Sequence, residues 1–208
     1  MRTHLTDAEL FKEDYVESSL TVNSALKRGQ QSGIVTLDNF LNDDAAAQLV
    51  KEALRVKKYS RPVRNWAHVT RTSLFTHTDT RSGLFAAAYT TLFRSSLAPV
   101  TEDVMYELAR DVRSYGDEVT IKPLATWVPN LIRFHYMQGD RHNHAVIPDH
   151  TDATALKGLV VAIELMGDNP GHTEIVLADD TCEIVGIPQA VHQVSTSGNR
   201  VSMTFAQM

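Results

Sequence analysis

The second half of this sequence consists of short runs rich in β-branched and aromatic residues, with turn residues between them. From residue 119 onward such runs lie at 119–121, 125–128, 131–136, 159–165, 173–177, 183–187, 190–195 and 200–206. Many short strands at close spacing are typical of a β-sandwich or barrel of the jelly-roll kind. The pattern therefore predicts a β-core over residues 119–208.

The first half of the sequence is predicted to be mostly helical. Thr6 and Glu9 form a capping-box pattern that predicts a helix over 7–18, and Asn42 with the two aspartates after it offers caps for a helix over 45–56. Further helices are expected over 84–95 and 101–115, whereas a β-branched run predicts a strand over 34–37. Residues 59–82 have little periodicity and are expected to be strand and loop.

The two halves are expected to form a single domain over residues 1–208, because no Pro/Gly-rich linker separates them. The predicted fold class is α+β, in which helices of a helix-rich part over 1–118 pack on the β-core over 119–208. The net charge of −5 gives no reason to expect nucleic acid as a partner. No apolar run reaches the roughly 18 residues that span a bilayer, and no signal-peptide core is present, so a cytoplasmic protein without a membrane partner is expected.

Cysteine usage limits the metal sites that the chain can build. The single cysteine, Cys182, excludes an intrachain disulfide and any zinc or iron–sulfur site made of several cysteines. A metal site must therefore use histidine and carboxylate ligands. The sequence predicts no particular oligomeric state.

Histidine and aspartate recur in the β-core at a spacing suited to a metal. His150 and Asp152 are two residues apart, and in an extended chain residues i and i+2 face the same side. His192 follows 40 residues after Asp152, within the strand expected at 190–195. Two histidines and one carboxylate make the facial triad that holds non-haem iron(II) and leaves positions open for other ligands. We therefore predict that His150, Asp152 and His192 bind iron and form the catalytic centre.

A cationic residue and a hydroxyl follow His192. The stretch from His192 to Ser202 has the pattern of a β-hairpin. If its loop has three residues, Gly198 is the third, a position where a left-handed conformation is usual and glycine is favoured. In that register His192, Arg200 and Ser202 share one face, whereas a two-residue loop would turn Arg200 to the other face. The turn chemistry favours the first register. Arg200 is therefore expected to offer its planar guanidinium to a carboxylate, with a further hydrogen bond from Ser202.

The order of these residues resembles that of the iron(II)/2-oxoglutarate-dependent oxygenases, in particular the prolyl-hydroxylase-like members. The resemblance is carried by HxD at His150 and Asp152, the distal His192, Arg-x-Ser at Arg200 and Ser202, and Tyr-x-x-Gly at 136–139. It implies a double-stranded β-helix core, iron(II), and 2-oxoglutarate and O2 as cosubstrates. It further implies hydroxylation of a C–H bond with release of succinate and carbon dioxide. By the same resemblance, Arg200, Ser202 and Tyr136 would hold the distal carboxylate of 2-oxoglutarate.

Other histidines offer competing sites. His77 and Asp79 repeat the same tripeptide, but no Tyr-x-x-Gly element precedes them, and we interpret them as a turn. His142 and His144 lie in a polar loop, where they either face a substrate or are solvated. Two alternative functions stay open on the same pattern. One is a cupin-like metal-dependent isomerase or lyase, and the other is a non-catalytic module that binds a small molecule on the same fold.

The segment 59–95 is the candidate region for substrate recognition. It combines arginines with aromatic residues and one histidine, at Arg61, Arg64, Arg71, Arg81, Arg94, Trp66, His68, Phe75, Tyr89 and Phe93. Such a combination is suited to a small molecule that is anionic or amino-acid-like, which is the predicted substrate class. Solvated surface arginines are the alternative interpretation. Arg133 and His135, expected on the strand face opposite Tyr136, are candidates of the same kind.

Overall fold

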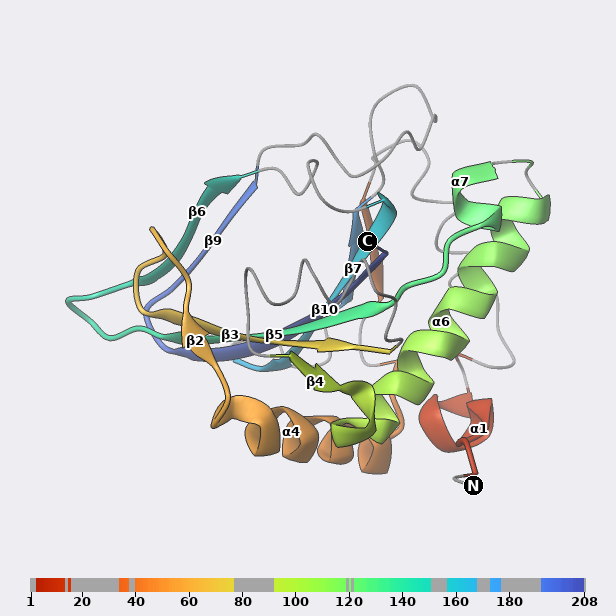
Figure 1. Cartoon of the computed structure of the whole chain (residues 1–208), viewed down its shortest axis with the longest axis horizontal. Coiled ribbons are helices and arrows are strands. Elements are labelled where there is room, and N and C mark those ends of the chain that lie inside the picture. The colour runs from red at the N-terminus through yellow and green to blue at the C-terminus, as the bar shows by residue number, and fades with distance from the viewer. Residues whose placement is uncertain are drawn as a thin grey trace.

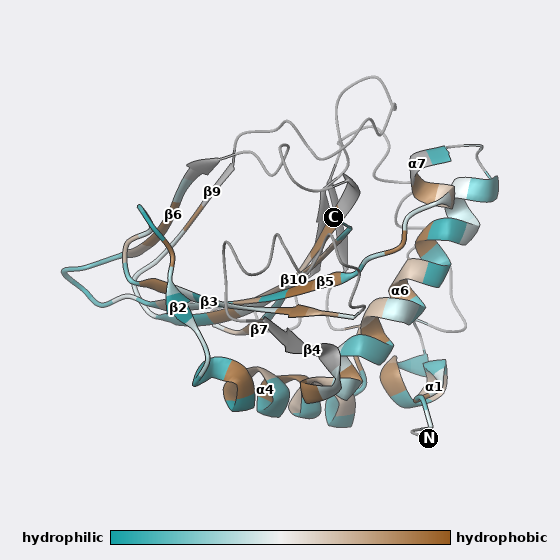
Figure 2. Cartoon of the chain, in the orientation of Figure 1, coloured by the Kyte–Doolittle hydropathy of each residue, from teal (hydrophilic) through white to brown (hydrophobic). Residues whose placement is uncertain are grey.

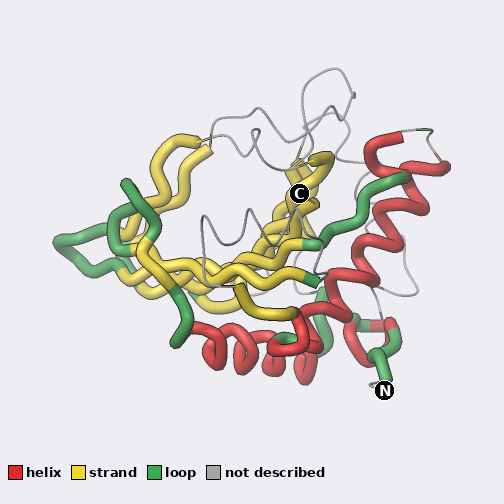
Figure 3. The backbone as a smooth tube through the Cα atoms, viewed as in Figure 1, coloured by secondary structure: helices red, strands yellow, loops and turns green. Residues whose placement is uncertain are grey.

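The computed structural model describes residues 3–13, 15, 34–37, 40–76, 92–118, 120, 122–150, 157–167, 173–176 and 192–207. Within these residues the chain forms one large and one small β-sheet, with helices packed beneath and beside the large sheet (Figure 1). Figure 3 shows the same arrangement coloured by secondary structure. The expected α+β class is confirmed. No helix in the described part of the chain is long and apolar enough to span a membrane.

Strands β6 and β9 belong to a different sheet from the strands that precede and follow them in the chain. The large sheet pairs, in order, β1 (Ile34–Leu37), β8 (Thr173–Val176), β7 (Lys157–Met166), β10 (Asn199–Gln207), β5 (Leu131–Gln138), β3 (Val69–Phe75) and β2 (Arg61–Pro62), and β4 (Leu92–Arg94) pairs with β3. The small sheet pairs β6 (Ala145–His150) with β9 (His192–Thr196). Thus β5, β7 and β10 lie in one sheet and the intervening β6 and β9 in the other, as in a double-stranded β-helix.

The helices pack against the large sheet. They are α1 (Asp7–Leu10), α4 (Asp43–Lys57), α6 (Pro99–Glu118) and α7 (Lys122–Ala125), with a 3-10 turn η1 (Ser95–Leu97) before α6. In Figure 2 hydrophilic and hydrophobic residues alternate around α4 and α6, as expected for helices that bury one stripe. These stripes and one face of the sheet form the main core, which contains Val56, Leu108, Phe134 and Met203.

The two faces of the large sheet carry different side chains. On β10, Val201, Met203 and Phe205 are buried in the main core with the helices, whereas Ser202 and Thr204 on the other face are only partly buried. Strand alternation accounts for this difference, because successive side chains point to opposite faces. The face away from the helices is therefore the polar one.

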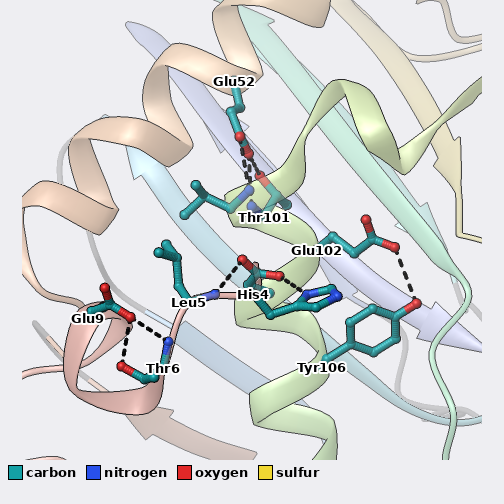
Figure 4. Close-up of polar contacts among 10 residues, drawn as sticks. His4, Leu5, Thr6, Glu9, Glu52, Thr101, Glu102 and Tyr106 are labelled. Atoms are coloured by element: carbon teal, nitrogen blue, oxygen red, sulfur yellow. Dashed lines mark hydrogen bonds and ion pairs between the residues drawn. The ribbon is translucent and has the colours of Figure 1, made fainter. Parts of the chain in front are cut away.

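Buried carboxylates join the helices to one another and to the N-terminal segment (Figure 4). Glu52 on α4 accepts hydrogen bonds from the backbone N–H of Val100 at 3.0 Å and of Thr101 at 2.8 Å, at the start of α6. The first N–H groups of a helix lack intrahelical partners, so a carboxylate there satisfies them. On α6 itself, Asp103 lies 2.5 Å from His4 Nδ1, which fastens the N-terminal segment to this helix.

The predicted starts of the N-terminal helix and of α4 are confirmed. Thr6 N and Oγ1 both donate to Glu9 Oε2 at 2.8 Å, which is the expected capping box, and Asn42 caps α4 through a bond from Asp44 N at 3.0 Å. However, α1 ends at Leu10 because Phe11 is extended, and helix is assigned again at Glu13 and Tyr15. The rest of the helix predicted over 7–18 lies outside the described residues. The helices expected over 45–56 and 101–115 are confirmed as α4 and α6.

Most of the strands in the second half are confirmed, and some elements were mispredicted. The runs at 131–136, 159–165 and 200–206 are strands, as are the described parts of 173–177 and 190–195. The strand expected at 125–128 is wrong, because α7 ends at residue 125 and a loop follows. In the run at 119–121 only Thr120 is described, and it is a turn with φ 61°. The end of the helix expected at 84–95 is strand β4. Residues 183–187 lie outside the described residues.

The first half also supplies strands, so the division into a helix-rich part and a β-core is incomplete. Strand β3 pairs with β5 along seven residues, from Val69 opposite Met137 to Phe75 opposite Leu131. Strand β1 pairs with β8 at the opposite edge. The sequence of β3 indicated a strand only weakly, because one face of β3 lies on the polar side of the sheet and carries polar residues.

Candidate metal and cosubstrate site

Strands β6 and β9 place two of the predicted ligands opposite each other. Their antiparallel register pairs Ile147 with Val194 and ends with His150 opposite His192. Directly paired residues of an antiparallel ladder share one face, with Cβ atoms about 4.5–5.5 Å apart. The two positions are therefore suited to two ligands of one metal ion.

An irregularity in this register decides which face position 150 occupies. Between the pairs Ile147–Val194 and His150–His192, two residues of β6, one of them Pro148, lie opposite a single residue of β9. Without that extra residue, the period-2 alternation would put position 150 on the face opposite to Ile147. Proline is tolerated at a bulge because it has no N–H to contribute to the ladder. The bulge thus places position 150 on the same face of the small sheet as the buried Ile147.

The large sheet turns Arg200 and Ser202 toward this small sheet. Arg200 pairs with Met137, and Met137 packs with Ile147 of β6 in a hydrophobic cluster that joins the two sheets. Ser202 pairs with His135 on the same face. The structure therefore brings Arg200 and Ser202 onto one face, as the sequence predicts.

Tyr136 lies on the other face of β5. Its hydroxyl donates to the carbonyl of Ala53 on α4 at 2.6 Å, and the side chain is 1% exposed. Burial raises the pKa of this hydroxyl above its ordinary value. Tyr136 is thus part of the helix–sheet core and lies apart from Arg200 and Ser202, contrary to the role implied by the family resemblance. His135 and Arg133 lie on the face opposite to it, as expected.

The connection from β9 to β10 differs from the predicted hairpin. The two strands separate into different sheets and do not pair with each other. The loop contains residues 197 and 198 only, and Gly198 does not have a positive φ. The expected left-handed conformation of Gly198 is therefore wrong. A loop that passes between two sheets does not need the twist of a hairpin turn, and Arg200 owes its orientation to its pairing with β5.

Gly139 holds this loop against the connection from β5 to β6. Its N–H donates to the carbonyl of Gly198 at 3.0 Å. A Cβ at position 139 would lie 2.2 Å from Thr196 O and 3.1 Å from Ala145 N, which are backbone atoms. Only glycine permits such a close approach of two chains. The glycine of the Tyr-x-x-Gly element therefore joins the ends of the two strands that carry the histidine positions.

Arg200 pairs with a carboxylate that had not been predicted. Its Nη2 lies 3.0 Å from Glu164 Oε2, and the two side chains are 26% and 8% exposed. Glu164 is on β7, opposite Ser202. Arg200 Nε is buried and has no hydrogen-bond partner in the described part of the chain. The sequence signal that could have indicated this pair is Glu164 itself, a single acidic residue within an apolar strand, because a buried charge requires a partner.

A cationic and aromatic group lies beside Ser202 on the same face. Arg71 on β3 pairs with His135 on β5, and its Cζ lies 5.7 Å from the centre of the Trp66 ring. The rings of Trp66 and His135 are 5.8 Å apart. His135 is buried, and Arg71 and Trp66 are half-buried. Part of the arginine-rich segment therefore faces the space between the sheets.

Other candidates of this region lie elsewhere. Arg61, Arg64 and His68 are exposed. His142 and His144 are also exposed, in a loop where Asp140 Oδ1 accepts a hydrogen bond from His142 N at 2.7 Å. This bond lowers the pKa of Asp140. Phe75 packs against the small cluster of Leu131, Val160 and Ala206. The others lie outside the described residues or have side chains that are not described, namely Arg81, Tyr89, Phe93 and Arg94.

The donor set of the predicted centre fits iron(II). Asp152 and the competing pair His77 and Asp79 lie outside the described residues, and among the described side chains no three His, Cys, Asp or Glu are grouped as a metal site. What the register establishes is that His150 and His192 occupy facing positions. With a carboxylate two residues after the first histidine, these positions provide the mixed nitrogen and oxygen ligands that suit non-haem iron(II).

Comparison with known proteins identifies the fold. No family model and no curated protein matches this chain. It is similar to a prolyl hydroxylase from Trichoplax adhaerens, solved with a hypoxia inducible factor peptide, with 8% identity over 94% of this chain and 92% of that chain and a TM-score of 0.58. It is also similar to a 2OG-Fe(II) oxygenase family oxidoreductase from Burkholderia pseudomallei (14% identity, 91% and 90% covered, TM-score 0.57). A prolyl-4-hydroxylase from Pseudomonas putida matches as well (10% identity, 90% and 100% covered, TM-score 0.56). The chain has the double-stranded β-helix fold of these oxygenases.

Proposed function

We propose that this chain is an iron(II)- and 2-oxoglutarate-dependent dioxygenase that hydroxylates a C–H bond of a small molecule and releases succinate and carbon dioxide. The observation that carries the proposal is the register of β6 and β9, which pairs His150 with His192 across a bulge. The fold shared with 2OG-Fe(II) oxygenases supports it, as does Asp152 two residues after His150.

The proposed iron ligands are His150, Asp152 and His192. Iron(II) with two imidazoles and one carboxylate supplies open coordination positions for a 2-oxo acid and O2, and with them the oxidative chemistry. The chain itself sets where these ligands lie. Cross-strand pairing sets the separation of the two histidine positions, and the packing of Gly139 against Thr196 fixes the same two strands at their other ends.

Arg200 and Ser202 are proposed to bind the distal carboxylate of 2-oxoglutarate. A guanidinium presents parallel N–H donors to a carboxylate, and such charge-assisted bonds are worth about 1.5–3 kcal/mol each. Arg200 keeps donor capacity beyond its contact with Glu164, since its Nε has no hydrogen-bond partner among the described residues. Ser202 lies two residues further along β10 on the same face.

The primary substrate is proposed to be a small anionic or amino-acid-like molecule. Arg71 on β3 and Trp66 in the connection from β2 to β3 lie beside His135, and His135 is on β5, the strand next to β10. A guanidinium stacked on an aromatic ring can bind a carboxylate at its edge while it keeps the ring contact. This arrangement supports an acidic group on the substrate, held separately from the group that contacts Arg200.

The function can be tested in the absence of a primary substrate by the conversion of 2-oxoglutarate and O2 to succinate and carbon dioxide, with iron(II) bound and ascorbate supplied as the reductant. Asp152→Ala is compared with Asp79→Ala, a matched control, because both aspartates end the same His-Thr-Asp tripeptide. We expect succinate formation to be lost in Asp152→Ala and kept in Asp79→Ala. The reverse result would move the metal site to His77 and Asp79. No succinate from the wild-type chain at saturating iron(II) and 2-oxoglutarate would contradict the proposal.

A further inference from the structure

A carboxylate of the chain itself forms an ion pair with the arginine that is proposed to bind 2-oxoglutarate. Glu164 Oε2 lies 3.0 Å from Arg200 Nη2, and Glu164 is only 8% exposed. A carboxylate that is withdrawn from water to this extent requires a nearby positive charge. Arg200 therefore has two tasks, because it neutralises Glu164 and offers its remaining donors to a ligand.

The space that Glu164 fills is created by a glycine at the end of β7. A Cβ at Gly167 would lie 2.2 Å from Glu164 Oε1 and 3.2 Å from Arg200 Cγ. Gly167 also has φ 150°, a backbone conformation that other residues rarely adopt. The carboxylate and the stem of the arginine thus pack where a side chain at position 167 would otherwise lie. The local chain is built to accommodate this ion pair.

A second carboxylate on the same guanidinium would be close to the first. Two carboxylates that share one guanidinium lie about 5 Å apart, and at an effective dielectric constant of about 20 their repulsion corresponds to a loss of affinity of roughly a few hundredfold. Relaxation and screening by water reduce this to about tenfold. The Glu164 carboxylate would repel the distal carboxylate of 2-oxoglutarate, whereas a 2-oxo acid without that carboxylate would bind without this repulsion.

We propose that Glu164 competes with the distal carboxylate of 2-oxoglutarate for Arg200, and that it thereby lowers the affinity of the site for this cosubstrate. The inference rests on the proposed function, since it takes Arg200 as the anchor. Glu164 is in this sense a specificity-determining residue, because it sets how strongly a dicarboxylate is preferred over a monocarboxylate. Its effect passes through Arg200 and not through the metal.

The test compares the dissociation constants of 2-oxoglutarate and 2-oxobutanoate, measured by calorimetry on the manganese(II)-loaded protein under anaerobic conditions. The two ligands share the metal-binding 2-oxo acid end, but 2-oxobutanoate lacks the distal carboxylate. Glu164→Gln keeps the shape and an acceptor oxygen for Arg200 while it removes the charge. We expect the constant for 2-oxoglutarate to fall about tenfold in Glu164→Gln and that for 2-oxobutanoate to stay within about twofold.

Two further variants separate the proposed effect from others. Asp117→Asn makes the same change in net charge at an exposed position on α6 and should alter neither constant. In an Arg200→Gln background, Glu164→Gln should give no gain, because the shared guanidinium is absent. If Glu164→Gln does not fold, as judged by thermal unfolding, Glu164→Asp withdraws the carboxylate by one methylene and should give a smaller gain of the same sign.

The outcomes distinguish this inference from the proposed function. An unchanged or weaker affinity of Glu164→Gln for 2-oxoglutarate overturns the competition, as does an equal shift for both ligands. If the wild-type protein prefers 2-oxoglutarate and Arg200→Gln removes the preference, the proposed function stands despite that failure. If the metal-loaded wild-type protein binds neither ligand, both proposals fail.

Discussion

The contact between Gly139 and Thr196 predicts that Gly139→Ala damages the metal site from a distance. The added Cβ would lie 2.2 Å from Thr196 O, whereas ordinary contacts of this kind begin at about 3.4 Å. Because the neighbours are backbone atoms, no side chain can rotate away. The loop that joins β9 to β10 must therefore move by about 1 Å, and β9 must move with it.

The expected loss of stability in Gly139→Ala has two contributions. Overpacking costs about 1–3 kcal/mol, and loss of the hydrogen bond from Gly139 N to Gly198 O costs about 0.5–1.5 kcal/mol more. We therefore expect the free energy of unfolding to fall by about 2–4 kcal/mol. For a chain of this size the midpoint of thermal unfolding should fall by roughly 5–15 °C. Affinity for iron(II) should fall as well, because the movement disturbs the pairing of His150 with His192.

Gly198→Ala is the matched control. Gly198 has no positive φ, and a Cβ there would meet nothing nearer than Thr196 Oγ1 at 4.0 Å. This variant should stay within about 0.5 kcal/mol of the wild-type protein. Urea unfolding measures the stability of both variants, and anaerobic titration measures their affinity for iron(II). If Gly139→Ala is as stable as Gly198→Ala and binds iron equally well, the close packing of the loop does not hold the two strands in register.

Two further predictions concern the cosubstrate anchor and the helices. Arg200→Lys keeps the charge but loses the planar fork, so the dissociation constant of 2-oxoglutarate should rise clearly, and Arg200→Ala should raise it by about ten- to a hundredfold. Normal binding by Arg200→Ala, measured by calorimetry, would show that another group holds the carboxylate, and Arg133 would be the first to test. On α6, burial raises the pKa of Glu107 from 4.5 to about 7, with a further contribution from Asp7, although Arg110 also contacts it. The folded chain then holds a proton that the unfolded chain releases, so stability should fall as pH rises from 4.5 to about 7. Urea unfolding across this range should show a smaller decline in Glu107→Gln, and an equal or steeper decline would contradict the assignment.

The sequence predicted those elements whose signals are local. Asn42 caps α4, and the apolar spacing around Leu108 marks α6, so both helices were found with nearly correct bounds. The order of His150, Asp152, His192 and Arg200 resembles that of the iron(II)/2-oxoglutarate oxygenases, and this resemblance implied the double-stranded β-helix. The expected sharing of a face by Arg200 and Ser202 was also correct, since it follows from strand alternation.

The remaining features depend on contacts that are distant in the sequence. Alternation shows that Tyr136 and His135 face opposite ways, but which of them meets the helices depends on how α4 packs, through Ala53. The face of His150 depends on a bulge that appears only when β6 is paired with β9. The hairpin prediction failed for a related reason, because strands adjacent in the chain need not belong to one sheet. Glu164 was missed since a single carboxylate has no spacing pattern.

The metal centre can be tested by anaerobic titration of the protein with iron(II) in the presence of 2-oxoglutarate, followed by visible absorption. We expect a weak metal-to-ligand charge-transfer band that saturates at about one iron per chain, as a 2-oxo acid bound to facially ligated iron(II) requires. The band should be lost in His192→Ala and kept in the control His77→Ala. No band at saturating iron(II), or a band of wild-type intensity in His192→Ala, would show that the pairing of His150 with His192 does not build the iron site.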